Sequence, residues 1–94
     1  MTRVRWTTDA ARDLARIVER IREDNPEAAR RVAETIYQGV ASLRNLPNRG
    51  RPGLAANTRE LIFAPWPYIA VDEVTASQDQ VHVLRIRHTS KNWP

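Results

Sequence analysis

The 94-residue chain contains no cysteine, and this absence excludes several kinds of chemistry. Without thiols there is no disulfide framework, no thiolate nucleophile and no zinc–thiolate site. Long apolar runs are also missing. No stretch approaches the ~18 residues of a membrane-spanning helix, and the first residues lack the apolar segment of a signal peptide. We therefore expect a soluble cytoplasmic protein with no membrane partner.

Aromatic residues are scarce: three Trp, two Tyr and one Phe. Apolar residues make up 41% of the chain, which is enough for one small core. We therefore expect a single domain over residues 1–94. Its stability should be modest, so that a tightly bound partner would help it to persist.

Lysine is almost absent, and the net charge of +4 comes mainly from arginine. Residues 9–34 hold six arginines and seven acids, whereas the rest of the chain holds nine basic and four acidic residues. Such a basic region attracts nucleic acid or an acidic protein segment. We predict that Arg49, Arg51 and Lys91 bind the target or nucleic acid. The alternative is that arginine is simply abundant in this sequence.

Two stretches have the apolar spacing of helices, after a short alternating strand at residues 3–6. Asn25-Pro26 separates them, with Asn as a cap and Pro in the first helical position, which predicts a helical hairpin. Another face of the first helix carries an arginine every fourth residue. The two apolar stripes and the arginine row are Ala10, Leu14, Ile17, Val18 and Ile21; Ala29, Val32, Ile36, Val40 and Leu43; and Arg12, Arg16 and Arg20.

Residues 48–57 carry only loop signals, and three strand patterns follow at 58–63, 68–74 and 80–87. Short connections between them favour an antiparallel meander. The predicted fold is α+β in the order β-α-α-β-β-β, with the helical hairpin on one face of a small antiparallel sheet. The predicted core joins Leu14, Ile17, Val32, Ile36 and Val40 to Ile62, Ile69, Val71 and Leu84.

The end of the last strand gathers cations and a histidine. Alternation places Arg85 and Arg87 on one side and His88 on the other, so the three converge only if the strand ends or twists there. RNA cleavage without a metal needs a base, an acid and a cation for the developing phosphorane charge. Arg59, Arg85 and Arg87 are candidates for the charge and His88 for the acid or base, with Tyr68 or Lys91 assisting. Alternatively, His88 is a strand-end histidine bonded to backbone.

The acidic residues give no sign of a metal site. Glu60, Asp72, Glu73 and Asp79 lie on separate segments, and the adjacent pair Asp72-Glu73 points to opposite faces of a strand. We therefore expect neither a metal nor another cofactor.

Several short motifs keep a fixed order along the chain: Gly50-Arg51-Pro52-Gly53, Thr58-Arg59-Glu60-Leu61, Pro67-Tyr68-Ile69-Ala70-Val71 and the closing segment 83–94. Together they resemble the RelE/ParE superfamily of toxins from bacterial type II toxin–antitoxin systems, over nearly the whole chain. The resemblance implies the same β-α-α-β-β-β fold and a growth-arresting toxin. It also implies a cognate acidic antitoxin that neutralises the toxin in a hetero-oligomer.

The superfamily contains two activities, and the resemblance implies one of them. RelE-like members cleave mRNA on the ribosome, and ParE-like members are associated with poisoning of DNA gyrase. Where RelE-like enzymes place a cation before Tyr68, this chain has Phe63 or Ala64, and no tyrosine follows the last strand. We therefore favour the ParE-like activity; Arg59, Arg85, Arg87 and His88 would be catalytic only in a RelE-like enzyme. A third possibility is an inactive module that only binds the antitoxin.

Two further residues carry expectations of their own. Asp72 stands where relatives usually place an aromatic residue, and we expect it to pair with an arginine of a neighbouring strand. Trp93 is expected to pack across the edge of the sheet.

Overall fold

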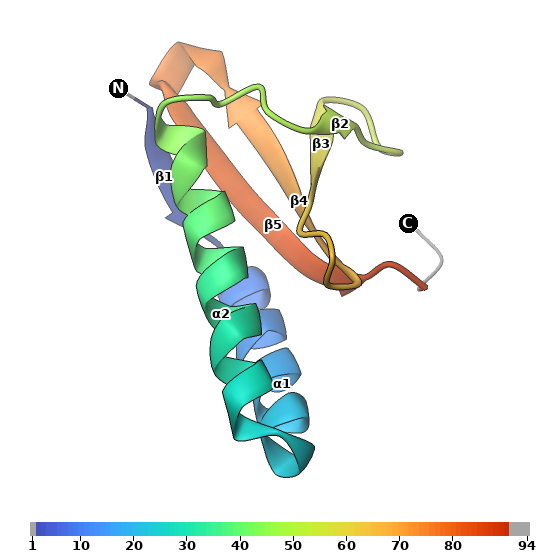
Figure 1. The fold of residues 1–94 in the computed structure, drawn as a ribbon. Helices are drawn as coiled ribbons and strands as arrows, with labels where there is room; N and C mark the ends of the chain where they lie inside the picture. The colour runs from blue at the N-terminus through green and yellow to red at the C-terminus, as the bar shows by residue number, and fades with distance from the viewer. Residues whose placement is uncertain (1, 91–94) are drawn as a thin grey trace.

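The structure, a computed structural model, describes residues 2–90 (Figure 1). Lys91 and Trp93, and the predictions made for them, lie outside the described residues. The elements are β1 (Arg3–Trp6), α1 (Thr8–Asp24), α2 (Pro26–Ala41), the 3-10 turn η1 (Ser42–Arg44), β2 (Arg51–Pro52), β3 (Thr58–Ile62), β4 (Tyr68–Thr75), the 3-10 turn η2 (Ala76–Gln78) and β5 (Gln80–His88). The predicted α+β class and element order are confirmed, with β2 as an additional short strand.

The strands form one sheet in the order β1-β5-β4-β3-β2. The predicted antiparallel meander is present as β3, β4 and β5. The sheet as a whole is mixed rather than antiparallel, because β1 pairs parallel with β5. This pairing joins the two ends of the sequence across the helical hairpin, and no local pattern reveals such a contact. β2 was missed because it has only two residues, one of them a proline at the sheet edge.

Side-chain caps fix where the two helices begin. The Thr7 hydroxyl accepts a hydrogen bond from the Ala10 N–H at 3.1 Å, and the Asn25 side chain accepts one from the Ala28 N–H at 3.1 Å. Pro26 occupies the first turn of α2, as predicted. The hairpin is therefore specified by residues at its bend, and Figure 1 shows its tip reaching past the end of the sheet.

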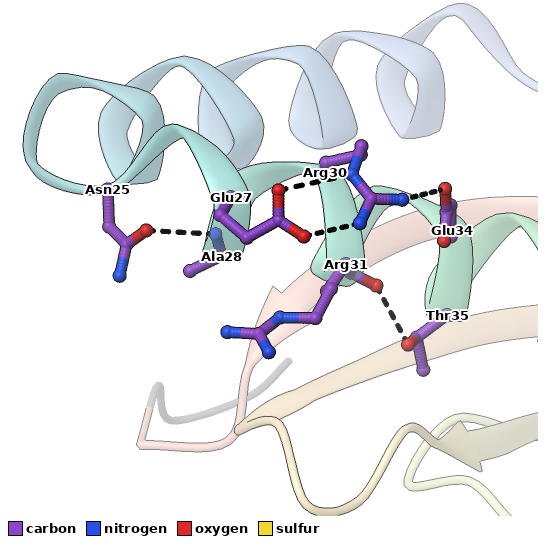
Figure 2. A network of polar contacts seen from close by, with 7 residues as sticks. All are labelled: Asn25, Glu27, Ala28, Arg30, Arg31, Glu34 and Thr35. Carbon is purple, nitrogen blue, oxygen red and sulfur yellow. Dashed lines mark hydrogen bonds and ion pairs between the residues drawn. The ribbon is translucent and has the colours of Figure 1, made fainter.

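Figure 2 shows the ion pairs near the start of α2. The Arg30 guanidinium pairs with Glu27, one turn before it, and with Glu34, one turn after it, at 2.7 Å. These contacts follow the i,i+3 and i,i+4 spacing at which helix side chains meet. The charge of Arg30 is thus balanced within its own helix.

Within residues 2–90, no helix is both long and apolar enough to cross a membrane.

The core lies between α2 and the sheet. The predicted helix residues Val32, Ile36 and Val40 are buried in it, and Leu14 and Ile17 of α1 pack against it partly exposed. The strands contribute Leu61, Phe63, Ala70, Val81, Val83 and Ile86.

The strand half of the predicted core was correct for Ile69 and Val71, which are buried, and wrong for Ile62 and Leu84. Ile62 is 47% exposed, Leu84 is half-buried, and Ile69 and Val71 are buried outside the core cluster. The prediction assigned the larger β-branched residues of β4 to the face that the helices cover. In the structure that face carries the small Ala70 and the polar Asp72, and the larger β-branched residues point the other way. Pattern alone does not tell which face of such a strand is covered.

Glycine at position 39 brings α2 close to the sheet. A Cβ atom at Gly39 would lie 2.6 Å from Cε1 of the buried Phe63 ring. The absent side chain therefore makes the space that Phe63 occupies.

Candidate functional site

A cleft of about 440 Å³ lies between α1 and the end of the sheet where β5 stops and β4 starts. Its walls come from three places in the sequence. The lining residues are Asp13, Arg16, Ile17 and Arg20 of α1, Tyr68 of β4, Arg85, Ile86, Arg87 and His88 of β5, and Ser90. Four arginines and one histidine face a single carboxylate, so the cleft is strongly cationic.

A bulge in β5 determines which side chains reach the cleft. Val71 pairs with Arg85 but Asp72 pairs with Val83, so Leu84 is an extra residue without its own partner on β4. The bulge shifts the alternation, and Ile86 joins Val81 and Val83 in the core. Arg87 and His88 then lie opposite Ile69 and Tyr68 at the strand end.

The carboxylate of Asp13 closes the free edge of β5. It accepts hydrogen bonds from the Ile86 N–H at 3.0 Å and from Nε and Nη2 of Arg85 at 2.7 and 3.1 Å. Burial by itself would raise the pKa of Asp13, but the hydrogen bonds from Arg85 and Ile86 outweigh burial and lower this pKa. Arg85 is therefore held in an ion pair that ties α1 to β5.

His88 is held by its neighbours in one orientation. Its ring meets the Tyr68 ring edge-on, with centroids 5.4 Å apart at 87°. The Ser90 backbone N–H lies 3.1 Å from Nδ1 of His88, and the Ser90 hydroxyl lies 2.7 Å from the same atom. Because a backbone N–H can only donate, Nδ1 must accept, and the proton of the neutral ring is assigned to Nε2. This contact matches the alternative interpretation of His88 as a strand-end histidine bonded to the backbone.

Arg16 and Arg20 are exposed and stand one turn apart on the α1 face that lines the cleft. In the sequence they belong to an arginine row for which no role was predicted, and none was predicted for Asp13. The sequence signal that could have identified them is their spacing. Two like charges at i,i+4 destabilise a helix unless a nearby opposite charge compensates. What was missing was the knowledge that this face of α1 lies against the end of β5.

The other predicted site residues lie elsewhere. Arg59 is on β3, opposite Asp72, and its Nη1 is 3.4 Å from the Gly50 carbonyl oxygen. Arg51 binds Glu60 at 3.0 Å, and Arg49 donates to the Ser42 hydroxyl at 2.8 Å. The cleft therefore brings together Arg85, Arg87 and His88, and leaves Arg59, Arg49 and Arg51 outside it.

Asp72 is fully buried, and neither of its carboxylate oxygens has a hydrogen-bond partner in the structure described. The expected pairing with an arginine is only partial, because Arg59 lies opposite in register and acts through its charge without a hydrogen bond. Burial raises the pKa of Asp72 to about 6, and the charge of Arg59 opposes that rise.

Residues 2–90 contain no cluster of metal-binding side chains. No group of three or more histidine or acidic side chains lies close enough together there to hold an ion. The functional groups that line the cleft are guanidinium, imidazole, phenol, hydroxyl and carboxylate groups.

Comparisons with known proteins agree on one family. The family model described as the ParE toxin of the type II toxin–antitoxin system parDE matches residues 4–93. Y4kP of Sinorhizobium fredii, named as a toxin candidate, is 41% identical over 92 residues, which cover 98% of this chain and 93% of that protein. Toxin RelE2 of Caulobacter vibrioides is 36% identical over 91 residues, covering 97% and 99%.

Solved structures give the same picture. A chain of the chromosomal ParDE system from P. aeruginosa has a TM-score of 0.85 at 29% identity, covering 96% of this chain and 98% of that one. A chain of the RelBE2 toxin–antitoxin complex from Mycobacterium tuberculosis has a TM-score of 0.61 at 24% identity, covering 93% and 96%, and shares the fold.

Proposed function

This chain belongs to the ParE toxin family of type II toxin–antitoxin systems, and we propose that it arrests growth without cutting RNA, by inhibiting DNA gyrase in the cytoplasm. A cognate antitoxin neutralises it in a hetero-oligomer. The toxin role follows from the family, and the mode of action is inferred from the chemistry of the cleft.

The state of His88 is the observation that carries the proposal. An imidazole acts as a base through a free lone pair, and as an acid through the proton of its charged form. The Nδ1 lone pair of His88 is taken by the Ser90 amide, and a proton on Nδ1 would face that amide N–H. In this tautomer the neutral ring donates a hydrogen bond from Nε2, and its acceptor nitrogen, Nδ1, is engaged by Ser90.

The arginines of the cleft support the same conclusion. Arg85, a candidate for stabilising a phosphorane, is already paired with Asp13. Arg59 lies two strands from β5, outside the cleft. In the position before Tyr68 where a RelE-like enzyme would carry a cation, this chain has Phe63 or Ala64, and neither side chain is charged.

Two assays with purified protein test the proposal. We expect gyrase supercoiling to fall, or cleaved gyrase–DNA complexes to accumulate, while mRNA in a translating extract stays intact. His88→Gln keeps a donor group and should change gyrase inhibition by less than about tenfold, below the ~10²–10⁴-fold typical of a lost acid or base. Site-specific mRNA cuts that disappear in His88→Gln would refute the proposal.

The second candidate is a ribosome-dependent mRNA endonuclease of the RelE type. Tyr68, Arg87 and His88 line one cleft, and a phenol, a cation and an imidazole are the groups that metal-free RNA cleavage uses. The relative named Toxin RelE2 is similar over almost its whole length. This candidate predicts cutting on the ribosome and unchanged plasmid topology. An inactive antitoxin-binding module would leave growth unaffected on overexpression.

A further inference from the structure

Several arginines between residues 2 and 90 form ion pairs with a carboxylate on the same element or on an element in contact with it. Arg22 pairs with Glu19, Arg51 with Glu60 and Arg85 with Asp13. Figure 2 shows Arg30 held between two glutamates on one helix face. In contrast, Arg16 and Arg20 form no hydrogen bond or ion pair with any residue between 2 and 90.

Among the described residues that line the cleft, no carboxylate is available to neutralise these two arginines. Asp13 precedes Arg16 by one turn, but its oxygens are engaged by Arg85 and by the Ile86 N–H. Two guanidinium groups at i,i+4 repel each other, and an anion between them would remove that repulsion. The arrangement is therefore suited to an anion that comes from outside the chain.

The remaining walls of the cleft restrict what kind of anion fits. His88 offers the Nε2–H that its contact with Ser90 leaves available, and Tyr68 offers a hydroxyl, so both can bind an acceptor oxygen. The half-buried Ile17 adds an apolar patch beside these donors. An acidic peptide segment can place a carboxylate on the donors and an apolar side chain on Ile17. A nucleic-acid backbone would carry its repeated phosphates past the Asp13 carboxylate, which repels them.

We propose that this cleft binds an acidic, partly apolar segment of the cognate antitoxin, with a carboxylate between Arg16 and Arg20 and an apolar neighbour against Ile17 and Tyr68. The proposal rests on the toxin assignment made above, but not on gyrase as the target. Arg16 and Arg20 are the specificity-determining residues of this contact.

Titration calorimetry with the antitoxin encoded beside the toxin gene tests the proposal. Arg16→Gln and Arg20→Gln should each weaken binding by roughly 10- to 100-fold, the usual effect of losing a hydrogen bond to a charged group. Both side chains are exposed, so the variants should fold as the wild type does. Arg12→Gln is the matched control, because Arg12 is in the same row but does not line the cleft; its affinity should stay within about twofold.

A reciprocal experiment identifies the partner residue. Arg20→Glu should bind poorly, and changing one acidic residue of the antitoxin to Lys should restore binding. Antitoxin affinity unaffected by Arg16→Gln and Arg20→Gln overturns the proposal. So does a short duplex DNA whose binding depends on both arginines while antitoxin binding does not. A toxin that fails to inhibit gyrase, yet loses antitoxin affinity in these variants, would refute the gyrase target and leave this contact supported.

Discussion

At the scale of single residues, Asp72 is the most costly feature of the fold. It is 0% exposed and its oxygens have no hydrogen-bond partner within the described part of the chain. An ionised carboxylate in such a place loses hydration that nothing replaces, which is why the pKa rises to about 6. The folded chain therefore holds this proton more tightly than the unfolded chain, in which an aspartate titrates near pH 4.

The consequence is a stability that falls as the pH rises. A raised pKa contributes stability in full below about pH 4 and loses it as the pH passes through about 6, by roughly 2–3 kcal/mol. We expect Asp72→Asn, which cannot ionise, to match the wild type near pH 4 and to be roughly 2 kcal/mol more stable near pH 8. Urea unfolding across this range measures the difference, and parallel curves for the two proteins would show that Asp72 does not titrate as inferred.

Asp13 should respond to pH in the opposite direction. Its pKa is lowered in the folded chain, so its contribution is present above about pH 4 and is lost as the pH falls below that value. Asp13→Asn should destabilise the protein by about 1–3 kcal/mol at pH 7, because Arg85 and the Ile86 N–H lose a charged acceptor.

A double-mutant cycle with Arg85→Ala separates the ion pair from the backbone contact of Asp13. If Arg85 acts mainly through Asp13, the two substitutions together should destabilise less than the sum of their separate effects. Additive effects would show that the pair contributes nothing to the fold.

At the scale of elements, the contact between α2 and Phe63, the residue that follows β3, depends on a missing side chain. Gly39→Ala improves helix propensity by about 1 kcal/mol but places a Cβ atom 2.6 Å from the Phe63 ring. Since Phe63 is buried and has little room to move, we expect a net loss of stability of about 1–2 kcal/mol. Thermal unfolding measures it, and Phe63→Leu in the Gly39→Ala background should recover part of the loss. A more stable Gly39→Ala protein would mean that the helix shifts without cost.

A large-to-small substitution in α2 tests the buried apolar stripe that the sequence periodicity predicted. Ile36 is fully buried in the core. Ile36→Ala should cost roughly 2–4 kcal/mol, because burial is lost and a cavity remains. Denaturant unfolding reports the difference, and a loss below about 1 kcal/mol would mean that the core closes over the site.

What could be predicted from the sequence depended on how local the signal was. The helices follow from apolar spacing and from Asn25-Pro26, whose capping role needs only adjacent residues. The parallel pairing of β1 with β5 and the covered face of β4 depend on contacts between distant segments. The alternation of apolar residues gives no sign of the bulge at Leu84. Because of this bulge, Ile86 rather than Arg85 lies in the core.

The candidate site shows the same limit. Arg85, Arg87 and His88 were found because they are neighbours at a strand end. Arg16 and Arg20 reach the same cleft because α1 packs along the edge of β5, where Asp13 binds the Ile86 N–H. Arg59 was named as a candidate for the developing charge because it is a cation, and the register of β3 places it opposite Asp72, outside the cleft.

At the scale of the whole molecule, the charge is arranged for an acidic partner. Residues 9–34 are nearly neutral in sum. Arg30 is paired within its own helix (Figure 2), whereas Arg16 and Arg20 line the cleft beside the cationic end of β5. The rest of the chain has nine basic residues against four acidic ones. Attraction between exposed charges is screened by salt, so the affinity for an acidic antitoxin should depend on ionic strength.

We expect the dissociation constant of the antitoxin complex to rise at least about tenfold between about 50 mM and about 500 mM salt. The slope of this dependence should be shallower in an Arg16→Gln, Arg20→Gln double variant, because two of the screened contacts are gone, and unchanged in Arg12→Gln. Calorimetry or fluorescence anisotropy at several salt concentrations gives all three slopes. Equal affinity at low and high salt would mean that the antitoxin is held by apolar packing alone. A salt dependence that is the same in all three proteins would place the electrostatic contact away from the cleft.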